Sequence, residues 1–147
     1  MARQAVGYRT TNGGTATLPM ASLYAGANGA LWLVEVGITN TTVTAYEISL
    51  ARFSTAGTST AVTGTYEESD VGFTASGTAR NSHSSTAPTL GVELRRASIG
   101  ASIGSGVIWT FGGRGLLIPS GVANGVGLLP ISGAAGQVSD VYWVWDA

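Results

Sequence analysis

Residues 138–145 read Val-Ser-Asp-Val-Tyr-Trp-Val-Trp, a β-branched and aromatic run close to the C-terminus. Successive side chains of a β-strand point to opposite faces of its sheet. Val141, Trp143 and Trp145 would therefore share one face and Tyr142 would lie on the other, so both faces carry large apolar groups. Such a strand is typical of a sheet that is covered twice. The core of the same chain can cover one face, and we expect a second copy or a partner protein to cover the other.

The rest of the sequence consists largely of short apolar runs that are separated by turns rich in Gly, Pro and Asn. Helical windows are confined to residues 20–24 and 94–101, which are too short to be stable helices. We predict one all-β domain, an antiparallel β-sandwich with the jelly roll as the favoured form, in which residues 1–30 form an N-terminal arm with the first short strands and residues 31–147 form the sandwich. The expected strands are residues 5–9, 16–18, 31–39, 44–52, 60–65, 71–75, 90–95, 106–111, 115–118, 126–129 and 138–145.

The clearest local pattern is a pair of alternating runs at residues 31–39 and 44–52, separated by a turn at Asn40. Asn suits a turn because it tolerates left-handed backbone and its side chain can imitate a turn hydrogen bond. The two runs are therefore predicted to pair as a β-hairpin with a central first strand. The predicted core residues are Trp32, Val34, Val36, Tyr46, Ile48, Leu50 and Trp109.

Charge is scarce in this chain of 147 residues: 10% are charged and the net charge is −1. A globular domain usually has about a quarter of its residues charged. All of the basic residues are Arg and they form no basic stripe, so we do not expect nucleic acid as a partner. No apolar run approaches the length of a membrane span, so we do not expect a membrane either. Arg without Lys fits fixed contacts at interfaces or, equally, a GC-rich codon bias. The absence of Cys excludes disulfides and thiolate metal sites.

Motifs that could carry chemistry are weak throughout. His83, the one histidine, lies in a Ser-rich stretch and is interpreted as a solvated loop residue without a nucleophile-elbow spacing around it. The acidic group at Glu67, Glu68 and Asp70 lacks a complete calcium loop and favours a loop tip. The run 112–115 around Arg114 could form an anion-binding nest, but a tight hairpin turn is favoured. We therefore expect no catalytic residue, no cofactor and no metal.

Aromatic residues suggest one further possibility, a platform for sugars. Trp32 and Trp109 alternate with apolar neighbours and are interpreted as core, which leaves Tyr142, Trp143 and Trp145 as candidates. Burial against a neighbouring subunit is the simpler explanation for these three residues.

Four stretches resemble small structural proteins of tailed bacteriophages: residues 35–42, 104–119, 123–128 and 142–146. The resemblance implies a jelly-roll virion protein, and specifically a capsid decoration or cement subunit that is assembled in the host cytoplasm. Its partners would be the major capsid protein on the capsid surface and its own copies, as a trimer or another homo-oligomer. We predict the subunit or capsid interface at Tyr142, Trp143, Trp145 and Arg114. The alternative is a minor tail protein or a receptor-binding or carbohydrate-binding β-sandwich.

Overall fold

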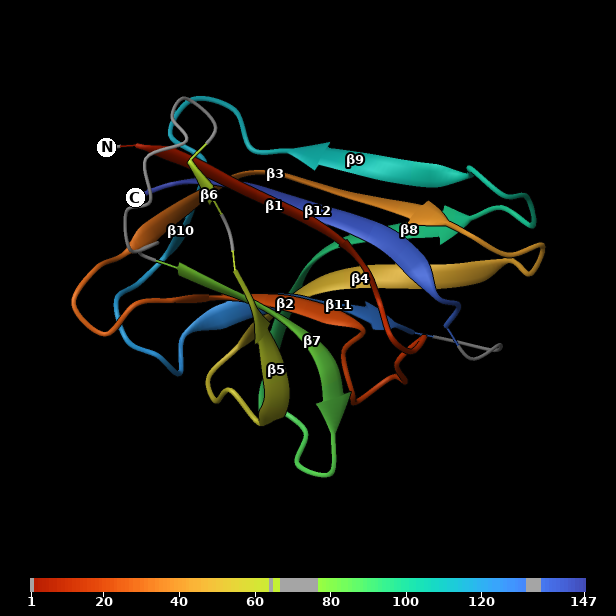
Figure 1. The fold of residues 1–147 in the computed structure, drawn as a ribbon, viewed down its shortest axis with the longest axis horizontal. Coiled ribbons are helices and arrows are strands. Elements are labelled where there is room, and N and C mark those ends of the chain that lie inside the picture. Colours follow the sequence, from red (N-terminus) through yellow and green to blue (C-terminus); the bar gives the residue numbers. More distant parts are fainter. Residues whose placement is uncertain (1, 64, 67–76, 132–135) are drawn as a thin grey trace.

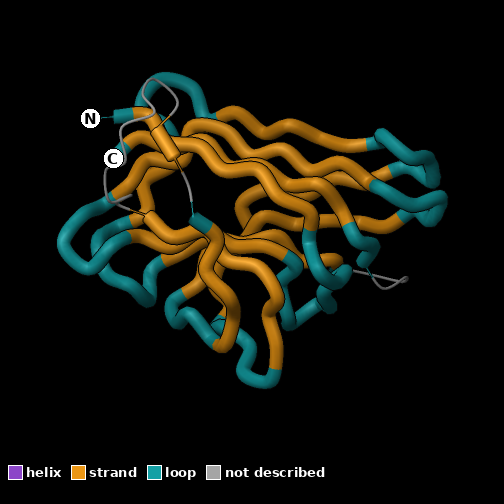
Figure 2. Tube along the Cα trace, viewed as in Figure 1, coloured by secondary structure: helices purple, strands orange, loops and turns teal. Residues whose placement is uncertain are grey.

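The protein is a β-sandwich of two packed antiparallel sheets (Figure 1). The computed structural model describes residues 2–63, 65–66, 77–131 and 136–147, which form strands and loops without a helix (Figure 2). The all-β sandwich and the scarcity of helix are confirmed, and the jelly roll stays a prediction. The strand predicted at residues 71–75 lies outside the described residues.

Sheet A contains the two chain ends and sheet B lies beneath it in Figure 1. Sheet A has the order β10-β3-β12-β1-β6, with β9 also paired to β3; its strands are β1 (Arg3–Arg9), β3 (Leu31–Asn40), β6 (Thr65–Tyr66), β9 (Gly106–Thr110), β10 (Leu116–Ile118) and β12 (Ser139–Asp146). Sheet B has the order β5-β7-β2-β11-β4-β8; its strands are β2 (Ala21–Ala25), β4 (Tyr46–Phe53), β5 (Thr58–Val62), β7 (Gly77–Ser84), β8 (Leu90–Ile99) and β11 (Gly125–Pro130).

The first thirty residues are part of the sandwich, so the predicted N-terminal arm is wrong. β1 pairs with β12 along its whole length, and the backbones of Ala2 and Ala147 hydrogen-bond to each other. β2 lies between β7 and β11 and is buried throughout, whereas residues 16–18 form no strand. The turn at residues 12–14 connects β1 in sheet A to β2 in sheet B, and the turn at residues 26–29 leads from β2 back to β3 in sheet A.

The predicted hairpin is also wrong, because β3 belongs to sheet A and β4 to sheet B. Each strand has a buried face, and the two buried faces lie opposite each other across the core. The strands are therefore not hydrogen-bonded neighbours in one sheet. Asn40 fixes the crossing: its Nδ2 donates to the carbonyl oxygens of Thr44 at 2.8 Å and Gly100 at 3.1 Å. A turn between two alternating runs therefore looks the same in the sequence whether the runs share a sheet or face each other.

Trp32 is half-buried rather than core because a β-bulge reverses the alternation of β3. Leu33 pairs with Trp145 and Glu35 pairs with Val144, which leaves Val34 as an extra residue without a partner on β12. An extra residue moves every later side chain to the opposite face. Leu33 is consequently in the core together with Val36, as are Ile38, Tyr46, Ile48 and Leu50. Val34 is half-buried, and Trp109 packs against the core without being enclosed.

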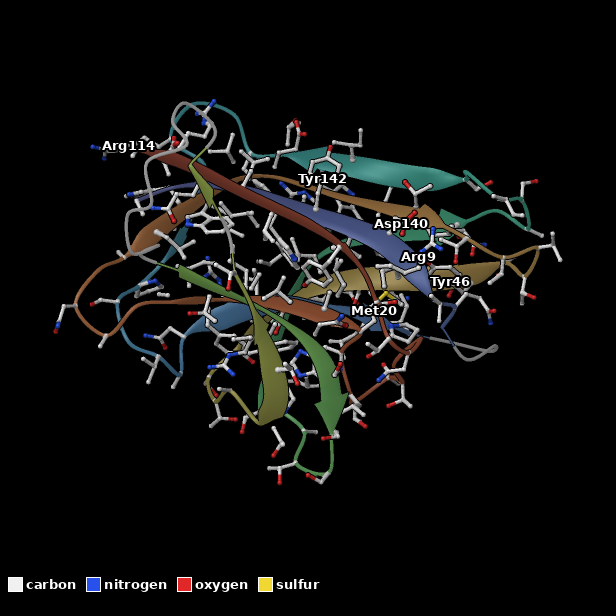
Figure 3. The ribbon with its side chains drawn as sticks, viewed as in Figure 1. Arg9, Met20, Tyr46, Arg114, Asp140 and Tyr142 are labelled. Atoms are coloured by element: carbon white, nitrogen blue, oxygen red, sulfur yellow. The ribbon has the colours of Figure 1, made fainter. Side chains whose placement is uncertain are left out.

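The glycine-rich run at residues 112–115 is not a hairpin turn. β9 and β10 both pair with β3, at residues 35–39 and 31–33, and so follow one another along the same edge. Between them the chain loops out opposite the bulge at Val34, whose carbonyl accepts a hydrogen bond from Phe111 at 2.9 Å. Gly113 and Gly115 have positive φ angles of 66° and 84°, which glycine adopts without strain. The loop carries Arg114 at the end of sheet A (Figure 3).

Candidate functional site

Two of the four predicted interface residues, Tyr142 and Arg114, lie at the outer face of sheet A, the side turned away from sheet B. Strand pairing arranges its side chains in four rows across the sheet. The rows are Arg9, Asp140 and Thr39; Gly7, Tyr142, Gly37 and Ile108; Ala5, Val144, Glu35 and Thr110; and Arg3, Asp146, Trp32 and Leu117. Tyr142 and Val144 are only half-buried, so no element of the described chain closes this face.

Tyr142 occupies the centre of the face and is held in place from two sides. Its ring lies over Gly37, because a Cβ atom built on Gly37 would overlap the ring atoms Cε1, Cζ and Cδ1. Its hydroxyl donates a hydrogen bond of 2.6 Å to Oε1 of Glu35. Burial and this hydrogen bond to a carboxylate raise the pKa of Tyr142 to about 12. Tyr142 is therefore a neutral, fixed aromatic side chain at neutral pH.

Two ion pairs stand at opposite ends of the face. Arg9 donates to both carboxylate oxygens of Asp140, at 2.8 and 3.0 Å, and Arg3 does the same to Asp146 at 3.0 Å each. The hydrogen bond and charge of Arg9 lower the pKa of Asp140, so this carboxyl group stays ionised. The side chains of Arg9 and Asp140 are 64% and 51% exposed, and surface pairs of this kind contribute little to folding. Their polar atoms remain open to a partner.

A shallow, open hollow lies between Tyr142 and the Arg9–Asp140 pair. It has a volume of about 400 Å³ and is lined by Gly7, Tyr8, Arg9, Thr39, Asp140, Val141 and Tyr142. Gly7 leaves room here, since a Cβ on it would meet no atom closer than 3.7 Å. Gly7, Arg9 and Asp140 were not predicted as site residues from the sequence. A signal for the hollow is present in the sequence as a glycine inside an alternating strand, next to an aromatic residue. Such a glycine indicates that another group approaches the backbone closely or that the surface is open there.

Arg114 and Trp32 form a stacked pair at the other end of the face. The guanidinium carbon of Arg114 lies 5.4 Å from the centre of the Trp32 ring, within the range of a cation–π contact. Leu117, the neighbour of Trp32 on β10, is 38% exposed, and its carbonyl accepts a hydrogen bond from Arg52 at 2.9 Å. Figure 3 shows Arg114 far from Arg9 and Asp140, with Tyr142 between them.

Trp143 and Trp145 do not reach this face. Both are fully enclosed in the core, with an exposed fraction of 0%, and the indole nitrogen of Trp143 donates to the hydroxyl of Tyr8 at 3.1 Å. Their rings therefore contribute to folding, and their predicted role at an interface is wrong. The inner face of β12 is apolar as predicted, whereas its outer face carries Asp140 and Asp146 on either side of Tyr142 and Val144. Tyr142, which is half-buried, and Arg114, which is exposed, remain the interface candidates.

His83 is an internal residue of β7 and not the solvated loop residue that the sequence suggested. It is 2% exposed, and its Nε2 lies 2.9 Å from the hydroxyl of Ser22, which is fully buried on β2. Burial, and secondarily the positive charge of Arg80, lower the pKa of His83 to about 4. Because both partners are enclosed, we interpret the Ser22–His83 contact as structural. The surrounding Asn-Ser-His-Ser sequence gave no apolar signal for burial.

The described part of the chain holds no group of three or more His, Cys, Asp or Glu residues placed to bind a metal ion. The acidic residues Glu67, Glu68 and Asp70 lie outside it. Among the described residues there is also no helix with the length and apolar character needed to cross a membrane.

Comparisons of the chain with protein-family models, with curated proteins and with solved structures found no match.

Proposed function

We propose that the protein is a non-enzymatic structural component of a tailed-bacteriophage virion, a capsid decoration or cement protein. In this function it attaches to the major capsid protein on the outside of the capsid and stabilises the lattice as a homo-oligomer, with a trimer as the expected form. The observation that carries the proposal is the uncovered outer face of sheet A, with an arginine–tryptophan pair at one end.

The end of that face has the composition of an interface anchor. Arg and Trp are enriched among the residues that dominate binding energy between proteins. Arg114 is exposed, Trp32 is half-buried beneath it, and Leu117 adds an apolar surface beside them. We therefore assign the first contact with the capsid or with a neighbouring subunit to Trp32, Arg114 and Leu117, and place Tyr142 at its margin.

The rest of the molecule fits a mechanical role. Its two sheets enclose a continuous core that includes the large side chains of Trp143 and Trp145. A rigid body loses little conformational entropy when it binds, so more of its contact energy appears as affinity. Many weak attachments on a symmetric lattice then reinforce one another.

The test is cosedimentation of the purified protein with empty capsids of the phage that encodes it, together with native mass spectrometry of the free protein. Arg114→Ala removes the cation over Trp32. The control is Arg95→Ala, which removes a similar cation 5.2 Å from the ring of Phe111 at the side of the sandwich. An interface anchor contributes about 2 kcal/mol or more, so Arg114→Ala should weaken attachment or oligomerisation about thirtyfold.

Attachment of the parent and of Arg95→Ala, with loss in Arg114→Ala, is the expected result. A parent protein that remains monomeric and never sediments with capsids would exclude this function. If Arg114→Ala and Arg95→Ala weakened attachment equally, the contact could not be assigned to the outer face of sheet A.

A further inference from the structure

We propose that the hollow beside Tyr142, at the end of sheet A opposite Arg114, binds a neutral pyranose sugar. This inference concerns a hollow that shares only Tyr142 with the Arg114 contact, and it does not depend on a function in a virion. It rests on the shape of the hollow, on one fixed aromatic side chain and on two exposed polar groups with set positions.

The shape suits a small, flat ligand. A volume of about 400 Å³ is at the lower end of the range of small-molecule sites, which is about 300–1,000 Å³. The missing side chain of Gly7 opens the space on β1, and the nearest atoms to a Cβ there are Tyr142 Cβ at 3.7 Å and the Val141 carbonyl oxygen at 3.8 Å. A sugar ring could enter from solvent without movement of the sheet.

Tyr142 supplies the apolar wall that the C–H surface of a pyranose needs. Aromatic side chains offer a large contact area with few rotatable bonds. The hydrogen bond from the Tyr142 hydroxyl to Glu35 and the packing of the ring over Gly37 fix this wall before a ligand arrives. Binding therefore has only a small entropic cost from ordering the protein.

Arg9 and Asp140 supply the polar edge. Arg9 donates through Nε and Nη2 to the two oxygens of Asp140, which leaves further N–H groups on Arg9 and further lone pairs on Asp140. A donor and an acceptor held side by side match two neighbouring hydroxyl groups of a sugar. Thr39 lines the same hollow and adds a hydroxyl-bearing side chain.

The charges favour a neutral ligand. Arg9 is already paired with Asp140, and the carboxylate of Glu35 lies at the far end of the Tyr142 ring. An added anionic group would face two carboxylates with a single, already paired guanidinium. Sulfated, phosphorylated or acidic sugars should consequently bind less well than neutral ones.

The experiment follows the backbone amides of the ¹⁵N-labelled protein by NMR during titration with glucose, galactose, mannose and N-acetylglucosamine, with N-acetylneuraminic acid as the anionic comparison. Gly7→Val fills the hollow, and its Cβ fits at an ordinary contact distance. Ala5→Val is the matched control, because Ala5 lies on the same strand and face but pairs with Val144 outside the hollow. Tyr142→Ala removes the wall as a second variant.

At least one neutral sugar should shift the amides that line the hollow, with a dissociation constant of about 1–10 mM, or roughly 3–4 kcal/mol of binding free energy. Gly7→Val and Tyr142→Ala should each weaken binding tenfold or more, and Ala5→Val should bind as the parent does. Failure of every sugar to shift these amides, equal binding by Gly7→Val, or binding of the acidic sugar alone would overturn the proposal. Shifts that depend on protein concentration alone would identify a second copy as the occupant instead.

Discussion

The ring of Tyr142 lies over Gly37, its direct partner on β3, and the Tyr142 hydroxyl reaches along the strand to Glu35 at 2.6 Å. This arrangement needs a residue without a side chain at position 37. Tyr142 is thereby held in a fixed position on the outer surface, whereas Trp143, the next residue in the sequence, packs into the core.

Replacing Gly37 should therefore displace Tyr142. Gly37→Val places a branched side chain where the ring lies, and forced repacking of this kind costs about 1–3 kcal/mol. The free energy of unfolding in urea measures this cost. The control is Thr39→Val, because Thr39 lies on the same face of β3 as Gly37 and this change should alter the free energy of unfolding little. The neighbouring residue Val36 is in the core and is not a suitable control. Equal stability of Gly37→Val and the parent would contradict the observed ring position.

Glu35→Gln should lower the pKa of Tyr142 from about 12 toward its ordinary value of 10.0. Burial is the largest cause of the raised pKa, but the carboxylate of Glu35 also accepts a hydrogen bond from the phenol and repels a phenolate, and a neutral amide does neither as strongly. Absorbance near 295 nm during an alkaline titration reports phenolate formation, and Tyr142→Phe identifies which transition belongs to this residue. An unchanged titration in Glu35→Gln would mean that Glu35 does not control the phenol.

The core tryptophans should matter more to folding than the surface one. Trp143→Ala should destabilise the protein by about 3–5 kcal/mol because it leaves a large cavity between the sheets. Trp32→Ala should cost clearly less, since Trp32 is half-buried on the outer face beneath Arg114. Thermal unfolding of both variants checks the order, and a greater loss in Trp32→Ala would place Trp32 back in the core.

Acid should weaken the fold through His83. Its pKa is near 6.5 when unfolded and about 4 in the folded protein, so the unfolded chain binds the proton first as the pH falls. The stabilisation is fully present above pH 6.5 and declines between pH 6.5 and 4, by about 2 kcal/mol between pH 6.5 and 5 at 1.4 kcal/mol per unit. Urea unfolding across this range measures the loss.

The matched variant is His83→Gln, which should be less stable at pH 7.5 but should vary less between pH 6.5 and 5. Asp140 and Glu93 also have lowered pKa values, but their stabilisation is lost only as the pH falls below about their ordinary values of 3.8 and 4.5. A parent protein with constant stability from pH 6.5 to 5 would show that His83 can be protonated without cost.

The sequence predicted the class of fold because period-2 alternation is a local property. Residues 44–52, for example, gave the buried positions Tyr46, Ile48 and Leu50 correctly. Alternation does not tell which strand lies beside which, so β3 and β4 were paired although they face each other across the core. The bulge at Val34 left no mark in the sequence, and one extra residue was enough to move Trp32 to the outside.

The candidate site was predictable only in part. The sequence predicts Tyr142 and Arg114 as interface residues, and both lie at the outer face of sheet A. Arg9 and Asp140 are 131 residues apart in the chain, and only the pairing of β1 with β12 brings them together. A single sequence contains no signal for a partnership that depends on the register of two distant strands.

Cryo-electron microscopy of the decorated phage capsid would show where the protein attaches and which of its residues make the contact. The proposed attachment through the Arg114 end predicts density for this β-sandwich at repeated positions on the capsid surface, with Trp32, Arg114 and Leu117 against the major capsid protein or a neighbouring copy. Capsids from a phage that lacks the protein should show the same lattice without that density. Particles that carry no such density, or that carry the protein with the Arg114 end facing solvent, would contradict it.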